Sequence, residues 1–130
     1  MTETTTWDAL SPYFPDRILP SQCPSRIVLD HVTSRWGVLV LISLVDTSLR
    51  WSELGRRVQG VSDKMLAQTL RTLQEDGLVH REVQPSAPPT VEYSLTDLGQ
   101  ELVQRLLPLV EWIAGNADSI LGDSTDRVMR

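Results

Sequence analysis

Four polar side chains in the middle of the sequence recur at helical spacing: Lys64, Gln68, Arg71 and Glu75. Three leucines fall on the opposite face of the same predicted helix: Leu66, Leu70 and Leu73. At 100° per residue, the leucines stack on the buried side and the polar row points away from it. Ammonium, amide and guanidinium groups donate hydrogen bonds, so the row can bind an anionic or polar partner. An ordinary solvated helix face is the alternative.

The sequence lacks the residue sets that catalysis requires. It contains no paired carboxylates, no nucleophile beside a base and no glycine-rich loop for phosphate. Its two histidines, His31 and His80, are far apart and have no neighbours at metal-ligand spacing. We therefore predict a binding protein rather than an enzyme, with no metal and no cofactor.

The composition indicates one domain. The chain has 130 residues, of which 41% are hydrophobic and 22% charged, enough for one hydrophobic core but short for two. No apolar run approaches the roughly 18 residues of a membrane span. The N-terminus shows no signal-peptide pattern, and the single cysteine excludes an internal disulfide. We expect a cytoplasmic protein with no membrane partner.

The charge is unevenly distributed along the chain. The net charge of −5 argues by itself against a nucleic-acid partner, because phosphates repel carboxylates. Between Ser34 and Gln84, however, seven bases outnumber six acids, so the acidity lies mainly outside the centre. This distribution permits a surface that faces a polyanion, although evenly solvated charge would give the same count.

Helix-start residues mark further helices before the polar row. Pro24 suits the first position of one helix, on which Ile27, Val28, His31 and Val32 recur at helical spacing, so we expect one face to be buried. Ser52 suits the N-cap of a short helix. Inside that short helix, Gly55 costs about 1 kcal/mol relative to alanine; close approach of the neighbouring helix would explain it.

After Gly77 the pattern changes from helix to strand. Residues 78–84 and 90–95 predict two antiparallel strands around a proline-containing loop. The earlier apolar run, 38–45, fits a buried strand as well as a buried helix, and periodicity does not decide between them. The predicted fold class is mainly α with a small antiparallel β hairpin.

The last predicted helix, which Thr96 can cap, has two apolar stripes. The first stripe is Leu98, Leu102, Leu106, Leu109 and Ile113. The second stripe is Val103, Leu107, Val110 and Ala114. A small domain covers only one such stripe with its own core, and a surplus stripe most often forms a subunit interface. We expect the second stripe to mediate homodimerisation.

Five motifs follow one another along the chain: "CP" at Cys23, "RW" at Arg35, "RWSEL" at Arg50, "GVSDKMLAQTLRTLQEDGLVHR" from Gly60 and "APPTVEYSLTDLG" from Ala87. In this order they resemble the HxlR-type branch of winged helix-turn-helix transcription regulators, which are related to the MarR group. The resemblance covers about 23–112 and implies that run 38–45 is a helix. We expect a partly flexible N-terminal arm (1–22), a winged helix-turn-helix domain that includes the dimerisation helix (23–117), and a C-terminal tail (118–130).

The resemblance implies a homodimeric regulator, which we expect to be a repressor, with two recognition helices in successive major grooves of a near-palindromic operator in double-stranded DNA. The residues placed towards DNA are Ser62, Lys64, Gln68, Arg71 and Arg81. Arg71 suits guanine and Gln68 suits adenine, whereas Lys64 suits phosphate. The wing departs from the family pattern, because Thr90 stands where many members have a base.

Cys23 is a candidate sensor, because several members of the family that the chain resembles detect oxidants or electrophiles through a cysteine at this position. The positive end of a helix dipole favours the thiolate, which attacks peroxides, quinones and disulfides. With no second cysteine in the chain, a disulfide requires another subunit or a small thiol. A purely structural role at the start of the helix is the alternative.

Two other functions remain open. A winged-helix module used only for protein–protein contacts would suit the acidic net charge. A ligand-responsive regulator would instead hold a small hydrophobic effector in a pocket at the dimer interface.

Overall fold

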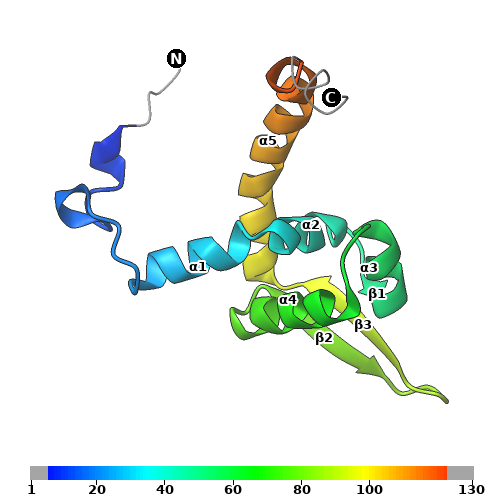
Figure 1. The fold of residues 1–130 in the computed structure, drawn as a ribbon. Helices are drawn as coiled ribbons and strands as arrows, with labels where there is room; N and C mark the ends of the chain where they lie inside the picture. Colours follow the sequence, from blue (N-terminus) through cyan, green and yellow to red (C-terminus); the bar gives the residue numbers. More distant parts are fainter. Residues whose placement is uncertain (1–5, 123–130) are drawn as a thin grey trace.

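The computed structural model describes residues 6–122. The N-terminal arm contains two 3-10 helices, η1 (Trp7–Ala9) and η2 (Pro15–Arg17). The elements that follow are α1 (Pro24–Val32), α2 (Arg35–Ser43), β1 (Leu49–Arg50), α3 (Trp51–Arg57), α4 (Asp63–Glu75), β2 (Val79–Gln84), β3 (Thr90–Leu95) and α5 (Asp97–Ile120). Figure 1 shows α2, α3 and α4 packed around the sheet, with the arm and the far half of α5 standing away from them. The predicted winged helix-turn-helix fold is confirmed.

The sheet of the described residues has the strand order β1-β3-β2, and both pairs are antiparallel. In the hairpin, Arg81 pairs with Tyr93 and Gln84 with Thr90, which confirms the two predicted strands. The sequence does not predict β1, because two residues are too few to show an alternating pattern. β1 pairs Leu49 with Tyr93, so the sheet is one strand larger than the predicted hairpin.

Helix α2 lies at the centre of the core. Its N-cap, Ser34, accepts a hydrogen bond from the Gly37 amide at 3.1 Å, and Val40 and Leu41 are fully buried. The helix packs against α1, α3, α4 and α5. The ambiguous apolar run 38–45 is therefore helical over most of its length, as the family resemblance implied.

Helix α3 begins differently from the prediction. Its N-cap is Arg50 rather than Ser52, and the Arg50 amide donates a hydrogen bond to the Glu53 carboxylate at 2.9 Å. The explanation expected for Gly55 is also wrong. Among residues 6–122, no atom outside the adjoining helix backbone lies within 4 Å of the place that a Cβ would occupy there. Gly55 is an exposed position with open space beside it.

Helix α1 is largely uncovered. Val32, at its C-terminal end, is buried, but Ile27 and Val28 are 38% and 44% exposed. The predicted buried face is therefore confirmed at Val32 and is wrong for Ile27 and Val28 within the protomer. Helical spacing reveals an apolar face, but it does not reveal whether the same chain or another chain covers it.

Helix α5 also distributes its apolar residues differently from the prediction. Val103 is 1% exposed where α5 packs against α2 and β3, so it belongs to the core of the protomer and its assignment to a dimer contact is corrected. Leu107 and Val110 are half-buried, and Ala114 is exposed. Three residues of the stripe expected in the core are instead exposed: Leu98, Leu109 and Ile113.

The far end of α5 extends past the predicted domain boundary. The helix ends at Ile120, so the first residues of the expected tail, 118–120, are helical. The rest of that tail from 123 onwards lies outside the described residues, as do residues 1–5 of the predicted arm. Within the described part of the chain, no helix combines the length and the apolar character needed to cross a membrane.

Candidate nucleic-acid interface

Helix α4 is held in place by its N-cap and by its apolar face. The Ser62 hydroxyl accepts a hydrogen bond from the Met65 amide at 3.1 Å, which satisfies a free donor of the first turn. Leu66, Leu70 and Leu73 are each 1% exposed. Turning the helix to expose them would cost about 1.5–3 kcal/mol for each leucine. The opposite face is therefore held outwards.

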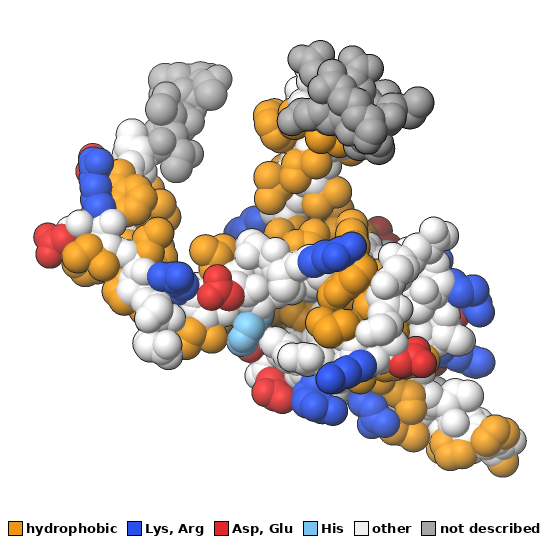
Figure 2. Space-filling model, in the orientation of Figure 1, with side chains coloured by type: hydrophobic (Ala, Val, Ile, Leu, Met, Phe, Trp, Pro, Cys, Tyr) orange, Lys and Arg blue, Asp and Glu red, His pale blue; other side chains and the backbone are white. Residues whose placement is uncertain are grey.

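The predicted polar row lies on that outward face. Lys64, Gln68, Arg71 and Glu75 are all exposed. Between residues 6 and 122, the side chains of Lys64, Gln68 and Arg71 form no ion pair and no hydrogen bond. In Figure 2, Lys and Arg side chains gather along the lower edge of the molecule, where α4 lies in Figure 1. These donors are available to a partner outside the chain.

A short turn joins α3 to α4. The Val61 amide donates to the Val58 carbonyl at 3.3 Å, and Gly60 adopts a φ of +93°, which favours glycine over residues with a Cβ. Val58 is buried, so it anchors the turn in the core. This helix–turn–helix arrangement places the second helix where it can enter a major groove while the first crosses the DNA backbone.

The wing follows α4 after Gly77, whose φ is +76°. Arg81 is exposed, and it shares a face of the sheet with the buried residues Val79 and Tyr93, because side chains alternate along a strand. That face is directed towards the helices. Arg81 is the only Lys or Arg in 78–95, so the tip of the wing offers no basic contact to phosphate.

The bases of the central segment are more available than its acids. All seven Lys and Arg residues between Ser34 and Gln84 are exposed. Two of the six acids, Glu53 and Asp76, are half-buried and accept internal hydrogen bonds. Four of the exposed bases were not singled out from the sequence: Arg35, Arg50, Arg56 and Arg57. The sequence signals for them are the charge asymmetry of this segment and, for Arg35 and Arg50, their places in two of the family motifs.

One side-chain bond joins α1 to the end of α4. His31 Nδ1 lies 2.7 Å from Asp76 Oδ2, and Asp76 is the C-cap residue of α4. The two residues are 45 positions apart, so no local pattern in the sequence indicates this pair. The bond fixes the exposed helix α1 relative to the predicted recognition helix.

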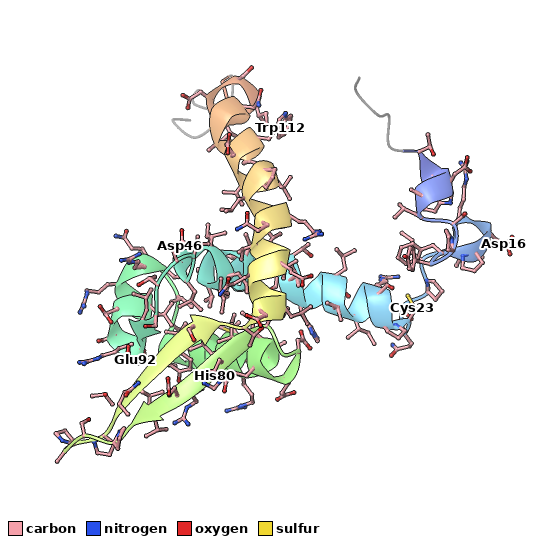
Figure 3. The ribbon with its side chains drawn as sticks, turned by 180° about the vertical axis from the view of Figure 1, so that it is seen from behind. Asp16, Cys23, Asp46, His80, Glu92 and Trp112 are labelled. Atoms are coloured by element: carbon pink, nitrogen blue, oxygen red, sulfur yellow. The ribbon has the colours of Figure 1, made fainter. Side chains whose placement is uncertain are left out.

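Cys23 is the half-buried N-cap residue of α1, and its thiol is free. Figure 3 shows it where the arm meets α1, far from His80 on the sheet. In the part of the chain that is described, no three His, Cys, Asp or Glu side chains are grouped so that they could hold a metal ion. The structure thus keeps Cys23 apart from the polar row of α4, with the length of α1 and the His31–Asp76 bond between them.

The family model for the HxlR-like helix-turn-helix matches residues 31–120. The chain belongs to this family. The HTH-type transcriptional regulator YtfH of Escherichia coli (strain K12) is 47% identical over 110 residues, which are 85% of this chain and 87% of the relative. The match therefore covers nearly the full length of both proteins.

Solved structures agree with this HxlR-like assignment. The transcriptional regulator ytfH from Salmonella typhimurium has a TM-score of 0.74 and 49% identity, over 82% of this chain and 95% of that one. The redox regulator HypR in its oxidised form has a TM-score of 0.68 and 37% identity, over 72% of this chain and 97% of that one. The HxlR-like chain is thus an HTH-type transcriptional regulator, a member of a regulatory rather than an enzymatic family.

Proposed function

We propose that this HxlR-like protein is a sequence-specific repressor that binds double-stranded DNA as a homodimer at a near-palindromic operator. The observation that carries the proposal is that α4 has one buried apolar face and one exposed polar face. Its leucines are enclosed in the core, whereas Lys64, Gln68 and Arg71 have no partner in the described chain. An α-helix fits the major groove of B-form DNA, where base edges present a distinct pattern for each base pair.

Each side chain of the interface has a role that follows from its chemistry. The Arg71 guanidinium can donate two hydrogen bonds to one guanine, and the Gln68 amide can pair with adenine. Lys64 and Ser62, close to the start of α4, suit phosphate oxygens. Arg81 supplies a backbone contact from the wing, whose tip is uncharged.

The uncovered helices support a homodimer. Ile27 and Val28 on α1 and Trp112 and Ile113 on α5 are all exposed, and large apolar side chains of this kind are a common mark of a protein interface. In a symmetric dimer, the two α4 helices would read two half-sites one helical turn of DNA apart, about 34–36 Å. The twofold symmetry of the protein is the reason to expect a near-palindromic operator.

Binding to a duplex from the protein's own upstream region tests the proposal, with fluorescence anisotropy as the readout and a scrambled duplex for comparison. Each bidentate contact contributes about 1–3 kcal/mol, and a dimer makes two, so Arg71→Ala should weaken operator binding by at least about 30-fold. Arg71→Lys is the matched control, because it keeps the charge but loses the bidentate geometry. It should keep the affinity for the scrambled duplex and reduce the preference for the operator over that duplex. Unchanged operator affinity of Arg71→Ala would favour a module for protein contacts instead.

We further propose that Cys23 senses an oxidant or a quinone. The similarity to the redox regulator HypR supports this role, as does the position of the thiol at the N-cap of α1. Diamide would take two electrons and two protons from two thiols, leaving a disulfide between Cys23 and either the second subunit or a small thiol. Cys23→Ser should keep operator binding and lose the response to diamide or quinone. A response that persists in this variant would point to a small hydrophobic effector at the dimer interface.

A further inference from the structure

The N-terminal arm has an apolar surface that its own chain leaves uncovered. Within residues 6–22 no side chain is buried, and four large apolar residues are 39–65% exposed: Leu10, Tyr13, Ile18 and Leu19. Figures 1 and 3 both show the arm standing away from the domain, and Figure 2 shows hydrophobic side chains along it. An apolar surface of this kind on a segment without a core indicates a protein partner.

The arm nevertheless has a defined course. Arg26 Nη1 donates a hydrogen bond to the Leu19 carbonyl at 2.7 Å, which ties the end of the arm to the first turn of α1. The Arg17 guanidinium lies over the Trp7 ring at 5.6 Å from its centroid. The arm precedes the range 31–120 that the family model matches.

An apolar groove of about 380 Å³ lies between α1 and α5. Its apolar lining is Val28, Val32, Leu78, Leu98 and Leu102, and its charged members are Glu101 and Arg105. A cavity of about 150 Å³ can hold a benzene ring. The groove is therefore large enough for two apolar side chains of the size found on the arm.

Twofold symmetry brings an arm to this groove. When the exposed faces of two α1 helices pack across a perpendicular twofold axis, the helices run antiparallel, and the start of one lies beside the end of the other. The nine residues of α1 are about 13 Å long. In that arrangement, the arm that ends at Cys23 of one copy would lie beside Val32 of the second copy, which lines the groove.

We propose that residues 6–22 of each copy bind the groove between α1 and α5 of the other copy, so that two exchanged arms clasp the dimer. The proposal rests on the proposed homodimer and adds the arm to its interface. The proposal also connects the arm to the predicted recognition helix. The arm would contact α1, and α1 is hydrogen-bonded through His31 to the end of α4.

Cross-linking between two differently marked chains tests the exchange. Both chains carry Cys23→Ser; one, labelled with ¹⁵N, also carries Tyr13→Cys, and the other carries Leu98→Cys. After subunit exchange and treatment with a short bismaleimide, mass spectrometry should find a peptide that joins position 13 to position 98. Since each chain has one cysteine, this peptide can form only between chains. Gln59→Cys, an exposed position near the DNA-facing turn, replaces Leu98→Cys in the control.

The outcomes separate this proposal from the proposed dimer. An equal yield with the Gln59→Cys control, or no peptide from a sample whose mass by light scattering is that of a dimer, overturns the arm exchange alone. A monomeric mass overturns the homodimer itself.

Dimer affinity gives a second, independent test. By analytical ultracentrifugation, Ile18→Ser should raise the dimer dissociation constant at least about 100-fold, because two apolar side chains per dimer lose their burial. Asp8→Ala, an exposed polar position in the same arm, should leave it unchanged. An unchanged constant for Ile18→Ser would also overturn the exchange.

Discussion

Replacing Gly55 with alanine should stabilise the protein. Gly55 lies inside α3, its φ is not positive, and a Cβ there would meet no atom of another element within the described residues. Alanine is favoured over glycine inside a helix by about 1 kcal/mol, partly because it reduces the freedom of the unfolded chain. For a domain of this size, that gain corresponds to a rise in Tm of about 3–6 °C.

The same substitution at Gly99 should have the opposite effect. Gly99 is buried in the first turn of α5, where its amide donates to the Thr96 hydroxyl at 3.0 Å. A Cβ at this position would collide with the backbone carbonyl of Leu78. Backbone cannot rotate aside as a side chain can, so α5 would have to move away from the start of β2. We expect a loss of about 1–3 kcal/mol, as for other overpacked sites.

Urea denaturation followed by circular dichroism measures the free energy of unfolding of both the Gly55→Ala and the Gly99→Ala variant. Wild type and variants are compared at one protein concentration, because the apparent stability of the proposed dimer would depend on it. A destabilised Gly55→Ala would refute the inference that the space beside this position is open. Operator affinity is measured on the same samples: a more stable Gly55→Ala that binds DNA more weakly would show that the DNA backbone approaches α3 at this glycine.

Four other substitutions test the anchoring and the use of α4. Leu70→Ala should lower the free energy of unfolding by about 2–5 kcal/mol, and Ser62→Ala by about 1 kcal/mol through the lost cap, both measured by urea denaturation. Asp76→Ala, which removes the bond to His31, should cost about 1 kcal/mol in the same assay. Lys64→Ala should weaken binding to operator and scrambled duplex alike, and should reduce the slope of log K against log salt by about 2 for a dimer; an unchanged slope would exclude a phosphate contact.

The parts of the fold that the sequence predicts are those whose signals are local. The cap at Ser62, the leucine spacing of α4 and the stop at Gly77 all lie within one short segment, and each agrees with the structure. Strand β1 and the His31–Asp76 bond depend on residues more than 40 positions away. No spacing rule connects such positions, so the structure was needed to find them.

The errors on α1 and α5 have one physical cause, which is that periodicity identifies an apolar face without identifying what covers it. The 24 residues of α5 form a helix about 36 Å long, whereas a domain of about 100 residues has a radius of gyration of only about 13 Å. The far half of such a helix therefore has to leave the core, and between residues 107 and 122 no residue of the chain is buried. Val103 lies close enough to α2 and β3 to be buried in the core of the protomer. Leu109 and Ile113 lie farther along the helix and remain exposed. The comparison of helix length with domain size thus places the proposed dimer contacts at these later, exposed residues rather than at Val103.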